Sequence, residues 1–161
     1  MTSSFCVFAL KTGIFHPNAS LFLPLIAAAQ DACGGFLDGD VLVVAETAVA
    51  TAEGNVVRLS DVTPSARACE LAGKYGIDPA RVEVVLQESD AIVGGIPGFL
   101  LCMKGGTLLP NAGVDASNAP PGCVTPLPKD PDGSAARIRK EVLQATGATI
   151  GVIIADSRTH A

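Results

Sequence analysis

Two kinds of local pattern share this chain, and together they limit the folds it can adopt. A Gly-Gly pair at 105–106 separates the apolar runs 99–104 and 107–110, which is the pattern of an antiparallel hairpin. Later in the chain, a helical pattern over about 134–146 stops at Gly147 and leads into a continuous apolar strand at 149–155. We therefore predict a mixed α+β fold with antiparallel hairpins rather than a doubly wound sheet.

Proline and glycine mark the ends of further elements. Thr63 precedes Pro64 and Asp78 precedes Pro79, and each pair is typical of a helix cap followed by proline at the first helical position. Gly76 closes the first of these two helices. The other elements that the pattern predicts are a strand at 4–10, a helix at about 20–33, strands at 41–45 and 55–59, and a loop at 94–98.

The composition fits a globular protein with an aliphatic core. The chain has 161 residues, which suits one ordinary domain or two small lobes. Apolar residues make up 48% and charged residues only 17%, with no Trp and one Tyr, so aliphatic side chains must fill the interior.

Charge and cysteine usage narrow the class of protein. The net charge is −5 without a block of like charges, whereas a nucleic-acid binder normally shows a basic stripe. The five cysteines are spread out with no C-x-x-C, which is typical of reduced thiols. The start of the chain has no signal-peptide pattern, and the longest apolar run, 21–29, contains a proline and is too short to span a bilayer. We expect a soluble, cytoplasmic protein that binds neither nucleic acid nor membranes.

Polar side chains gather at three places where an apolar strand or a tight turn ends. Oxygen ligands of this kind suit Mg²⁺ or Mn²⁺, which take one or two carboxylates and complete their shell with phosphates or water. The three groups are Asp115, Ser117 and Asn118 in "NAGVDASN"; Asp156, Ser157, Arg158 and His160 after the last strand; and Glu46, Thr47 and Thr51 after the strand at 41–45.

Each of these groups also has an ordinary structural interpretation. Asp and Asn in a Gly- and Pro-rich loop usually accept hydrogen bonds from their own turn, so both interpretations stay open for Asp115. Asp156 follows a five-residue apolar run, where a carboxylate has to be accommodated. Asp130 and Asp132 fit a helix cap and a turn better than a metal site. His16, beside a proline, is more often a loop residue than a catalyst.

Several familiar nucleotide and hydrolase signatures are absent. The sequence has no G-x-x-x-x-G-K-[ST], no G-x-G-x-x-G after a strand and no G-x-S-x-G. If this protein binds a nucleotide, it must hold the phosphates in another way.

Four segments together resemble a known family, the coenzyme F-420-0:L-glutamate ligases, also called gamma-glutamyl ligases. They are "GDVLVVAETAVATAEGNVVRLSDVTPSARACELA", "NAGVDASN", "PKDPDGSAARIRKEVLQATG" and "GVIIADS", in the family's order. The resemblance covers nearly the whole chain and is weakest before residue 36. It implies a single gamma-glutamyl-ligase-like domain over 1–161 that corresponds to the N-terminal part of family members and lacks their C-terminal portion. It also implies an intertwined homodimer.

The resemblance implies a reaction as well. Family members use GTP and Mn²⁺ or Mg²⁺ to add L-glutamate to a deazaflavin coenzyme precursor. GTP phosphorylates the terminal carboxylate of the precursor, and the amine of glutamate then attacks the acyl phosphate. The alternatives are a catalytically incomplete binding or assembly module of the same fold, and a ligase for another carboxylate acceptor.

Matching the motifs residue by residue assigns roles to this chain. The resemblance makes Asp115, Asp156 and Ser157 metal ligands, although Ser157 stands where the family usually has Thr. Thr51 stands where the family usually has a Lys, and family members continue beyond the position that matches Ala161. The nucleotide-contacting positions implied by the resemblance are Ile14, Phe15, His16, Pro17, Glu46, Thr47, Thr51 and Asn118.

Overall fold

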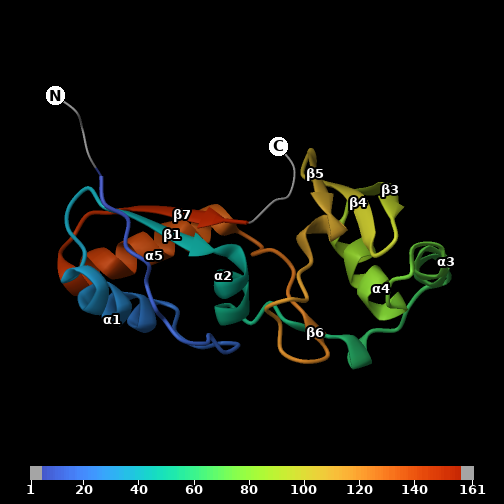
Figure 1. Ribbon diagram of the computed structural model, residues 1–161, viewed down its shortest axis with the longest axis horizontal. Coiled ribbons are helices and arrows are strands. Elements are labelled where there is room, and N and C mark those ends of the chain that lie inside the picture. The colour runs from blue at the N-terminus through green and yellow to red at the C-terminus, as the bar shows by residue number, and fades with distance from the viewer. Residues whose placement is uncertain (1–4, 157–161) are drawn as a thin grey trace. The chain divides into compact units, whose positions relative to one another are not determined.

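Two compact units make up the fold. The computed structural model describes residues 5–156. Residues up to Glu53 and from Lys129 onwards form the first unit, and Gly54–Pro128 form the second (Figure 1). The second unit is therefore an insertion in the sequence of the first.

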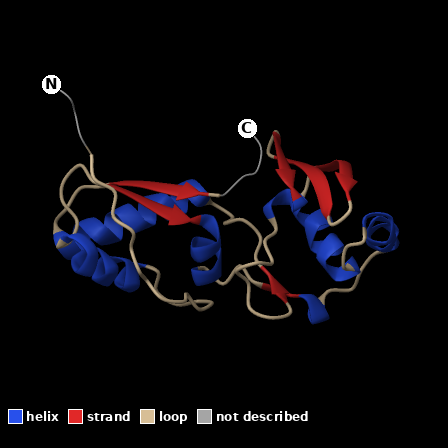
Figure 2. Ribbon diagram, viewed as in Figure 1, coloured by secondary structure: helices blue, strands red, loops and turns tan. Residues whose placement is uncertain are grey.

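The first unit is built around two parallel strands. β1 (Val41–Ala45) pairs in parallel with β7 (Gly151–Ala155), and Ala45 lies opposite Ala155. Helices α1 (Phe22–Cys33), α2 (Glu46–Ala52) and α5 (Pro131–Thr146) complete the unit (Figure 2). One face of β1 turns Leu42 and Val44 into an aliphatic core, as the alternation of a strand requires. The other members of that core are Leu25, Val49, Ile138, Val142, Ala148 and Ile150.

The second unit contains a three-stranded antiparallel sheet. Its strands are β3 (Ala91–Ile96), β4 (Phe99–Lys104) and β5 (Thr107–Pro110), in that order. Helices α3 (Ala66–Tyr75) and α4 (Pro79–Glu88) pack with the sheet around Val82, Val85, Leu100 and Cys102. The short elements are β2 (Val57–Arg58), paired with β6 (Cys123–Val124), and the 3₁₀ turns η1 (Leu59–Asp61) and η2 (Asn111–Gly113).

Much of the predicted secondary structure is confirmed. The mixed fold, the hairpin at Gly105-Gly106 and the strand at 41–45 are all present. Asp78 caps α4, since its carboxylate accepts a hydrogen bond from the Arg81 N–H at 2.9 Å, with proline at the start of the helix. Gly147 ends α5 in the left-handed conformation. None of the helices within residues 5–156 is both long and apolar enough to cross a membrane.

Other predicted boundaries are wrong. Residues 5–10 form no strand, and the described part of the chain supplies no neighbouring strand to pair with them. Ser65, not Thr63, caps α3, because its hydroxyl accepts the Ala68 N–H at 3.2 Å. The helix expected from 134 begins earlier, at Pro131. Asp130 is its N-cap, and the Asp130 carboxylate accepts a hydrogen bond from the Gly133 N–H. The expected strands at 55–59 and 149–155 are shorter, at 57–58 and 151–155.

The predicted loop at 94–98 is instead largely strand. Gly94 and Gly95 pair with β4, and only Pro97 and Gly98 make the turn. A Cβ at Gly95 would lie 2.6 Å from the Phe99 carbonyl oxygen and 2.9 Å from the Tyr75 ring. This glycine permits close approach of neighbouring groups rather than a turn.

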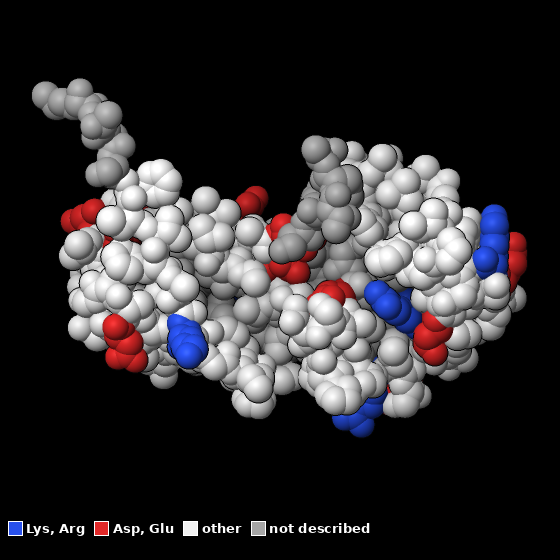
Figure 3. All heavy atoms as spheres, in the orientation of Figure 1, with Lys and Arg blue, Asp and Glu red and all other residues white. Residues whose placement is uncertain are grey.

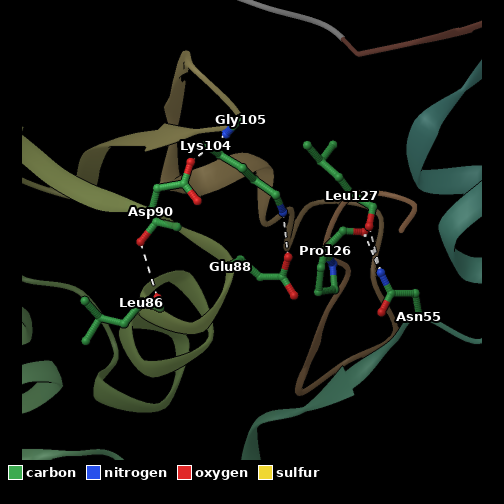
Figure 4. A network of polar contacts seen from close by, with 9 residues as sticks. Asn55, Leu86, Glu88, Asp90, Lys104, Gly105, Pro126 and Leu127 are labelled. Atoms are coloured by element: carbon green, nitrogen blue, oxygen red, sulfur yellow. Dashed lines mark hydrogen bonds and ion pairs between the residues drawn. The ribbon is translucent and has the colours of Figure 1, made fainter. Parts of the chain in front are cut away.

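Polar side chains fix the ends of the second unit's elements (Figure 4). An ion pair of 2.6 Å between Lys104 and Glu88 joins β4 to the end of α4. The Asp90 carboxylate accepts the Gly105 N–H at 2.7 Å and so holds the hairpin turn. The Asn55 side-chain amide donates to the Leu127 carbonyl at 2.8 Å, which anchors the segment after β6.

A run of left-handed residues leads out of the sheet. Asn111, Ala112 and Gly113 have φ values of 49°, 52° and 75°. Such conformations are costly for residues other than glycine and persist only where the surroundings hold them. Here the Asn111 side chain is buried, and its oxygen accepts the Leu100 N–H at 2.9 Å. The chain therefore leaves β5 in a fixed direction.

Leu100 and Leu101 test the two faces of β4. Leu100 is fully buried, whereas Leu101 is 36% exposed. We expect Leu100→Ala to lower the free energy of unfolding by about 3 kcal/mol, because it removes buried methyl groups and leaves a cavity. Leu101→Ala is the control and should cost less than about 1 kcal/mol in urea denaturation. Equal losses would contradict the assigned core.

Asn111 tests the anchoring of the left-handed run. We expect Asn111→Ala to cost about 3 kcal/mol, since it leaves the Leu100 N–H without an acceptor and places alanine at positive φ. Asn18 is a matched control because it also has a positive φ, 59°, but is exposed. Asn18→Ala should cost only about 1 kcal/mol. If chemical denaturation gives the same loss for both variants, the buried hydrogen bond does not anchor the turn.

Candidate functional site

Asp115 lies in a tight turn that its own carboxylate organises. Its backbone forms an isolated antiparallel bridge with Thr125, in which each N–H donates to the other's carbonyl, at 2.9 and 2.7 Å. Oδ1 of Asp115 accepts the Ser117 N–H at 2.9 Å and the Ser117 hydroxyl at 2.8 Å, and Oδ2 accepts the Asn118 N–H at 3.1 Å. The turn interpretation of Asp115 is thus confirmed.

Burial and hydrogen bonding act in opposite directions on the pKa of the Asp115 carboxylate. The carboxylate accepts two hydrogen bonds from Ser117 and one from Asn118, and the backbone of Ala116 also lowers its pKa. Burial, the largest single influence, raises the pKa of Asp115, but the bonds from Ser117, Asn118 and Ala116 outweigh it and hold the pKa below its usual value. The group is therefore an anion at neutral pH, as a ligand for a hard cation must be.

The exposed tip of the turn carries the other two polar residues of the motif. Ser117 and Asn118 are both exposed. The Ser117 hydroxyl donates a hydrogen bond to the Asp115 carboxylate, and the Asn118 backbone N–H donates another. The Asn118 side chain is exposed at the tip of the turn.

The second predicted group lies at the carboxyl ends of the parallel strands in the first unit. Glu46 follows Ala45 and Asp156 follows Ala155, and these two alanines are paired in the β1–β7 register. The structure therefore brings Glu46 and Asp156 to the same end of the strand pair. That end is where ligands bind in open sheets with parallel strands. Ser157, Arg158 and His160 lie outside the described residues.

Helix α2 carries the remaining residues of the third group. Thr47 and Thr51 are four residues apart and so share one face of the helix. The Thr51 side chain is buried, with only 7% of the residue's surface exposed. Its predicted contact with a nucleotide stays a prediction, as does that of Thr47.

The early nucleotide segment has no regular structure. Ile14, His16 and Pro17 are exposed and Phe15 is half-buried. The His16 carbonyl accepts the Ala19 N–H at 3.1 Å in a turn just before α1. The segment is accessible, but nothing in its geometry by itself indicates a ligand.

One polar cluster was not predicted. The Glu53 carboxylate, at the end of α2, accepts hydrogen bonds from the Ser134 hydroxyl and the Arg137 guanidinium on α5. Ser134 is buried, and its hydroxyl also contacts the Asp130 carbonyl at 2.9 Å. These partners are more than 80 residues apart, so no local signal reveals them. The cluster connects the two ends of the first unit's interrupted chain.

The described residues offer a divalent cation single carboxylates rather than a preformed cluster of ligands. Within residues 5–156 no three His, Cys, Asp or Glu side chains come together as a ready-made metal cage. Mg²⁺ and Mn²⁺ need no such cage, since one or two carboxylates suffice when phosphate oxygens and waters supply the rest. Asp115, and separately Asp156, are carboxylates of that kind.

Charged side chains are spread over the face of the molecule that Figure 3 draws. Lys and Arg side chains on the face drawn in Figure 3 are scattered among acidic ones and form no stripe.

Comparisons with known proteins agree with the motifs. The sequence model of the family described as F420-0:Gamma-glutamyl ligase matches residues 9–161. The chain is 42% identical over 135 residues to the coenzyme F420:L-glutamate ligase of Methanothermobacter thermautotrophicus, which covers 83% of this chain and 54% of the relative. The proteins of the same name from Methanopyrus kandleri and Archaeoglobus fulgidus are 46% and 44% identical over 122 residues each, covering 75% and 76% of this chain.

The matched regions are only part of these relatives. The chain spans about half the length of the curated relatives it matches, 48% and 49% for the last two. The match nevertheless extends over nearly all of the present sequence and includes every predicted site residue. The chain therefore belongs to the F420-0:gamma-glutamyl ligase family.

Proposed function

We propose that this protein acts in a GTP- and divalent-metal-dependent amide ligase that adds L-glutamate to the deazaflavin coenzyme precursor F-420-0. The observation that carries the proposal is the family match over residues 9–161, within which the motif residues stand in order. The relatives' name, coenzyme F420:L-glutamate ligase, supplies the substrate class. The ionised carboxylate of Asp115 supports the metal requirement.

The proposed reaction has two steps, phosphoryl transfer and amide formation. The terminal carboxylate of the coenzyme attacks the γ-phosphorus of GTP, which forms an acyl phosphate and releases GDP. The amine of glutamate then attacks the acyl carbon, so that the amide bond forms, phosphate leaves and the amine loses a proton. Bound Mn²⁺ or Mg²⁺ supplies charge neutralisation to the phosphates.

The chain's own residues serve this reaction by binding and orientation. Asp115 in the second unit would be one cation ligand, and Asp156 and Ser157 in the first unit would be others. Asn118 would contact the nucleotide. The bonds from Ser117 and Asn118 fix the Asp115 carboxylate before any ligand arrives, so little ordering is needed on binding. The other nucleotide contacts in this proposal are Ile14, Phe15, His16, Pro17, Glu46, Thr47 and Thr51.

Thr51 stands at a position where the family usually has a lysine. A lysine at this position would place a positive charge near the phosphates, whereas threonine supplies none. We therefore infer that nucleotide binding by this chain depends more strongly on the divalent cation than it would with a lysine at position 51.

Asp115→Asn tests the metal site directly. We expect wild-type protein to bind GTP in the presence of Mn²⁺ and only weakly without it. The variant should lose at least about tenfold in Mn²⁺-dependent affinity, because the amide has no charge to offer the cation. Isothermal titration of GTP, with and without Mn²⁺, measures both effects.

Asp61→Asn is the matched control for this experiment. Asp61 is an exposed carboxylate of the same unit, and the substitution makes the same change in net charge. It should leave the affinity unchanged. GTP binding that ignores both Mn²⁺ and Asp115→Asn would overturn the assigned site, provided circular dichroism shows that the variant is folded.

A second candidate function is an assembly module that associates without nucleotide. One observation favours it: the outer face of β1 exposes Val41 and Val43, at 60% and 61%, and the neighbouring strand exposes Ile153. Parallel strands are normally covered on both faces. A homodimer, as expected from the resemblance, would cover this face in either candidate function.

Light scattering separates these cases. We expect the purified chain to have the mass of a dimer, and Val43→Lys to shift it towards the monomer because a charge cannot be buried in an apolar contact. Val93→Lys is the control, since Val93 is similarly exposed on β3 of the other unit. Dimers that form without nucleotide, together with no GTP binding by calorimetry, would favour the assembly module over the ligase. A monomeric wild type would reject the dimer.

A further inference from the structure

Thr125 carries a buried hydroxyl that has no partner. Among the buried side-chain nitrogen and oxygen atoms of residues 5–156, two lack a hydrogen bond: Arg81 Nε and Thr125 Oγ1. Arg81 is partly exposed, whereas Thr125 is only 1% exposed. Burying a hydroxyl without a partner is destabilising, and valine would fill nearly the same space without that cost. The hydroxyl therefore needs a partner other than the described side chains, such as a water or a ligand.

The backbone register places this hydroxyl next to Asp115. Thr125 and Asp115 exchange both of their N–H···O=C bonds, at 2.9 and 2.7 Å, so they are directly opposite each other in an antiparallel bridge. Directly opposite residues project their side chains from the same face, with Cβ atoms about 5 Å apart. The Thr125 hydroxyl and the Asp115 carboxylate thus lie on one side of the bridge, within reach of one bound ion or its water.

The surroundings of Thr125 hold it in place. Val124 before it and Pro126 after it are both buried, and Val124 belongs to the β2–β6 pair. Asn55 donates a hydrogen bond to the Leu127 carbonyl two residues further on (Figure 4). The β-branched side chain of threonine also has few rotamers. The unpartnered oxygen is therefore a fixed feature of the site and not a mobile surface group.

The chemistry of the pair selects a hard divalent cation. An ionised carboxylate and a neutral hydroxyl oxygen are both ligands of Mg²⁺ and Mn²⁺. Mg²⁺ also keeps several waters, and one of these can bridge to a nearby hydroxyl. Anionic ligands fit poorly, because the negative charge of Asp115 would repel them.

We propose that Thr125 is a further cation-binding residue of the Asp115 site, with its hydroxyl oxygen bonded to the divalent cation or to a water of its shell. This inference rests on the proposed metal site at Asp115 and adds a residue that no sequence motif indicated. It does not depend on which carboxylate acceptor the enzyme uses.

Thr125→Val and Thr125→Ser test the proposal in the purified chain, with Mn²⁺ as the probe. Electron paramagnetic resonance measures free Mn²⁺ in titrations with and without GTP, and thermal unfolding without metal measures stability. We expect Thr125→Val to weaken Mn²⁺ binding about tenfold, as the loss of a supporting oxygen does, and to raise Tm by about 2 °C. Thr125→Ser keeps the oxygen and should keep most of the affinity.

Thr107→Val is the control, because Thr107 is an exposed threonine on β5 of the same unit. It should change neither Mn²⁺ binding nor Tm. Asp115→Asn is measured alongside to report on the metal site itself.

The other outcomes separate the role of Thr125 from the metal site at Asp115. If Thr125→Val binds Mn²⁺ as wild type does while Asp115→Asn does not, Thr125 has no role at the cation and the proposed metal site stands. If Thr125→Val lowers Tm and leaves Mn²⁺ binding unchanged, the hydroxyl holds a structural water and the inference is wrong. If the wild type binds no Mn²⁺ even with GTP, the metal site of the proposed function falls and the role of Thr125 falls with it.

Discussion

The parallel pairing of β1 with β7 is the contact on which the first unit depends. It joins residues 41–45 to residues 151–155, across an insertion that folds as a unit of its own. A two-stranded sheet is marginal by itself, so α1 and α5 must cover its inner face with Leu25, Ile138 and Val142. The Glu53–Ser134–Arg137 cluster fastens the unit at the point where the chain leaves and returns. The same pairing brings Glu46 and Asp156 to one end of the strands.

In the second unit, the backbone around Asp115 is held rigidly. The left-handed run from Asn111 to Gly113 directs the chain out of the sheet, and the buried Asn111 side chain holds it there. A Cβ at Gly113 would lie 2.6 Å from the side chain of Leu127, so the backbone also packs tightly against the returning segment. The bridge to Thr125 then fixes Asp115. Strain of this kind is typical of segments that position a ligand-binding group.

The two halves of the candidate chemistry are thus built by different means. In the first unit, carboxylates follow the ends of parallel strands, where backbone direction alone places them together. In the second, a turn closed by its own Asp presents a carboxylate next to a buried, unpartnered hydroxyl. Both groups lie within the region that matches the F420-0:gamma-glutamyl ligase family, and both are used in the proposed ligase.

The sequence by itself determined those features that depend on neighbouring residues. Asp78 before Pro79 specified a helix start, Gly147 a helix end and Gly105-Gly106 a hairpin, because caps and turns act over a few residues. The Gly- and Pro-rich setting of Asp115 predicted, for the same reason, the turn that its carboxylate closes. Only the tertiary structure decided that Gly95 lies in a strand against Phe99 and Tyr75, that Glu53 meets Ser134, and that Thr125 faces Asp115. These contacts join distant residues, and they depend on how the elements pack, which no local pattern encodes.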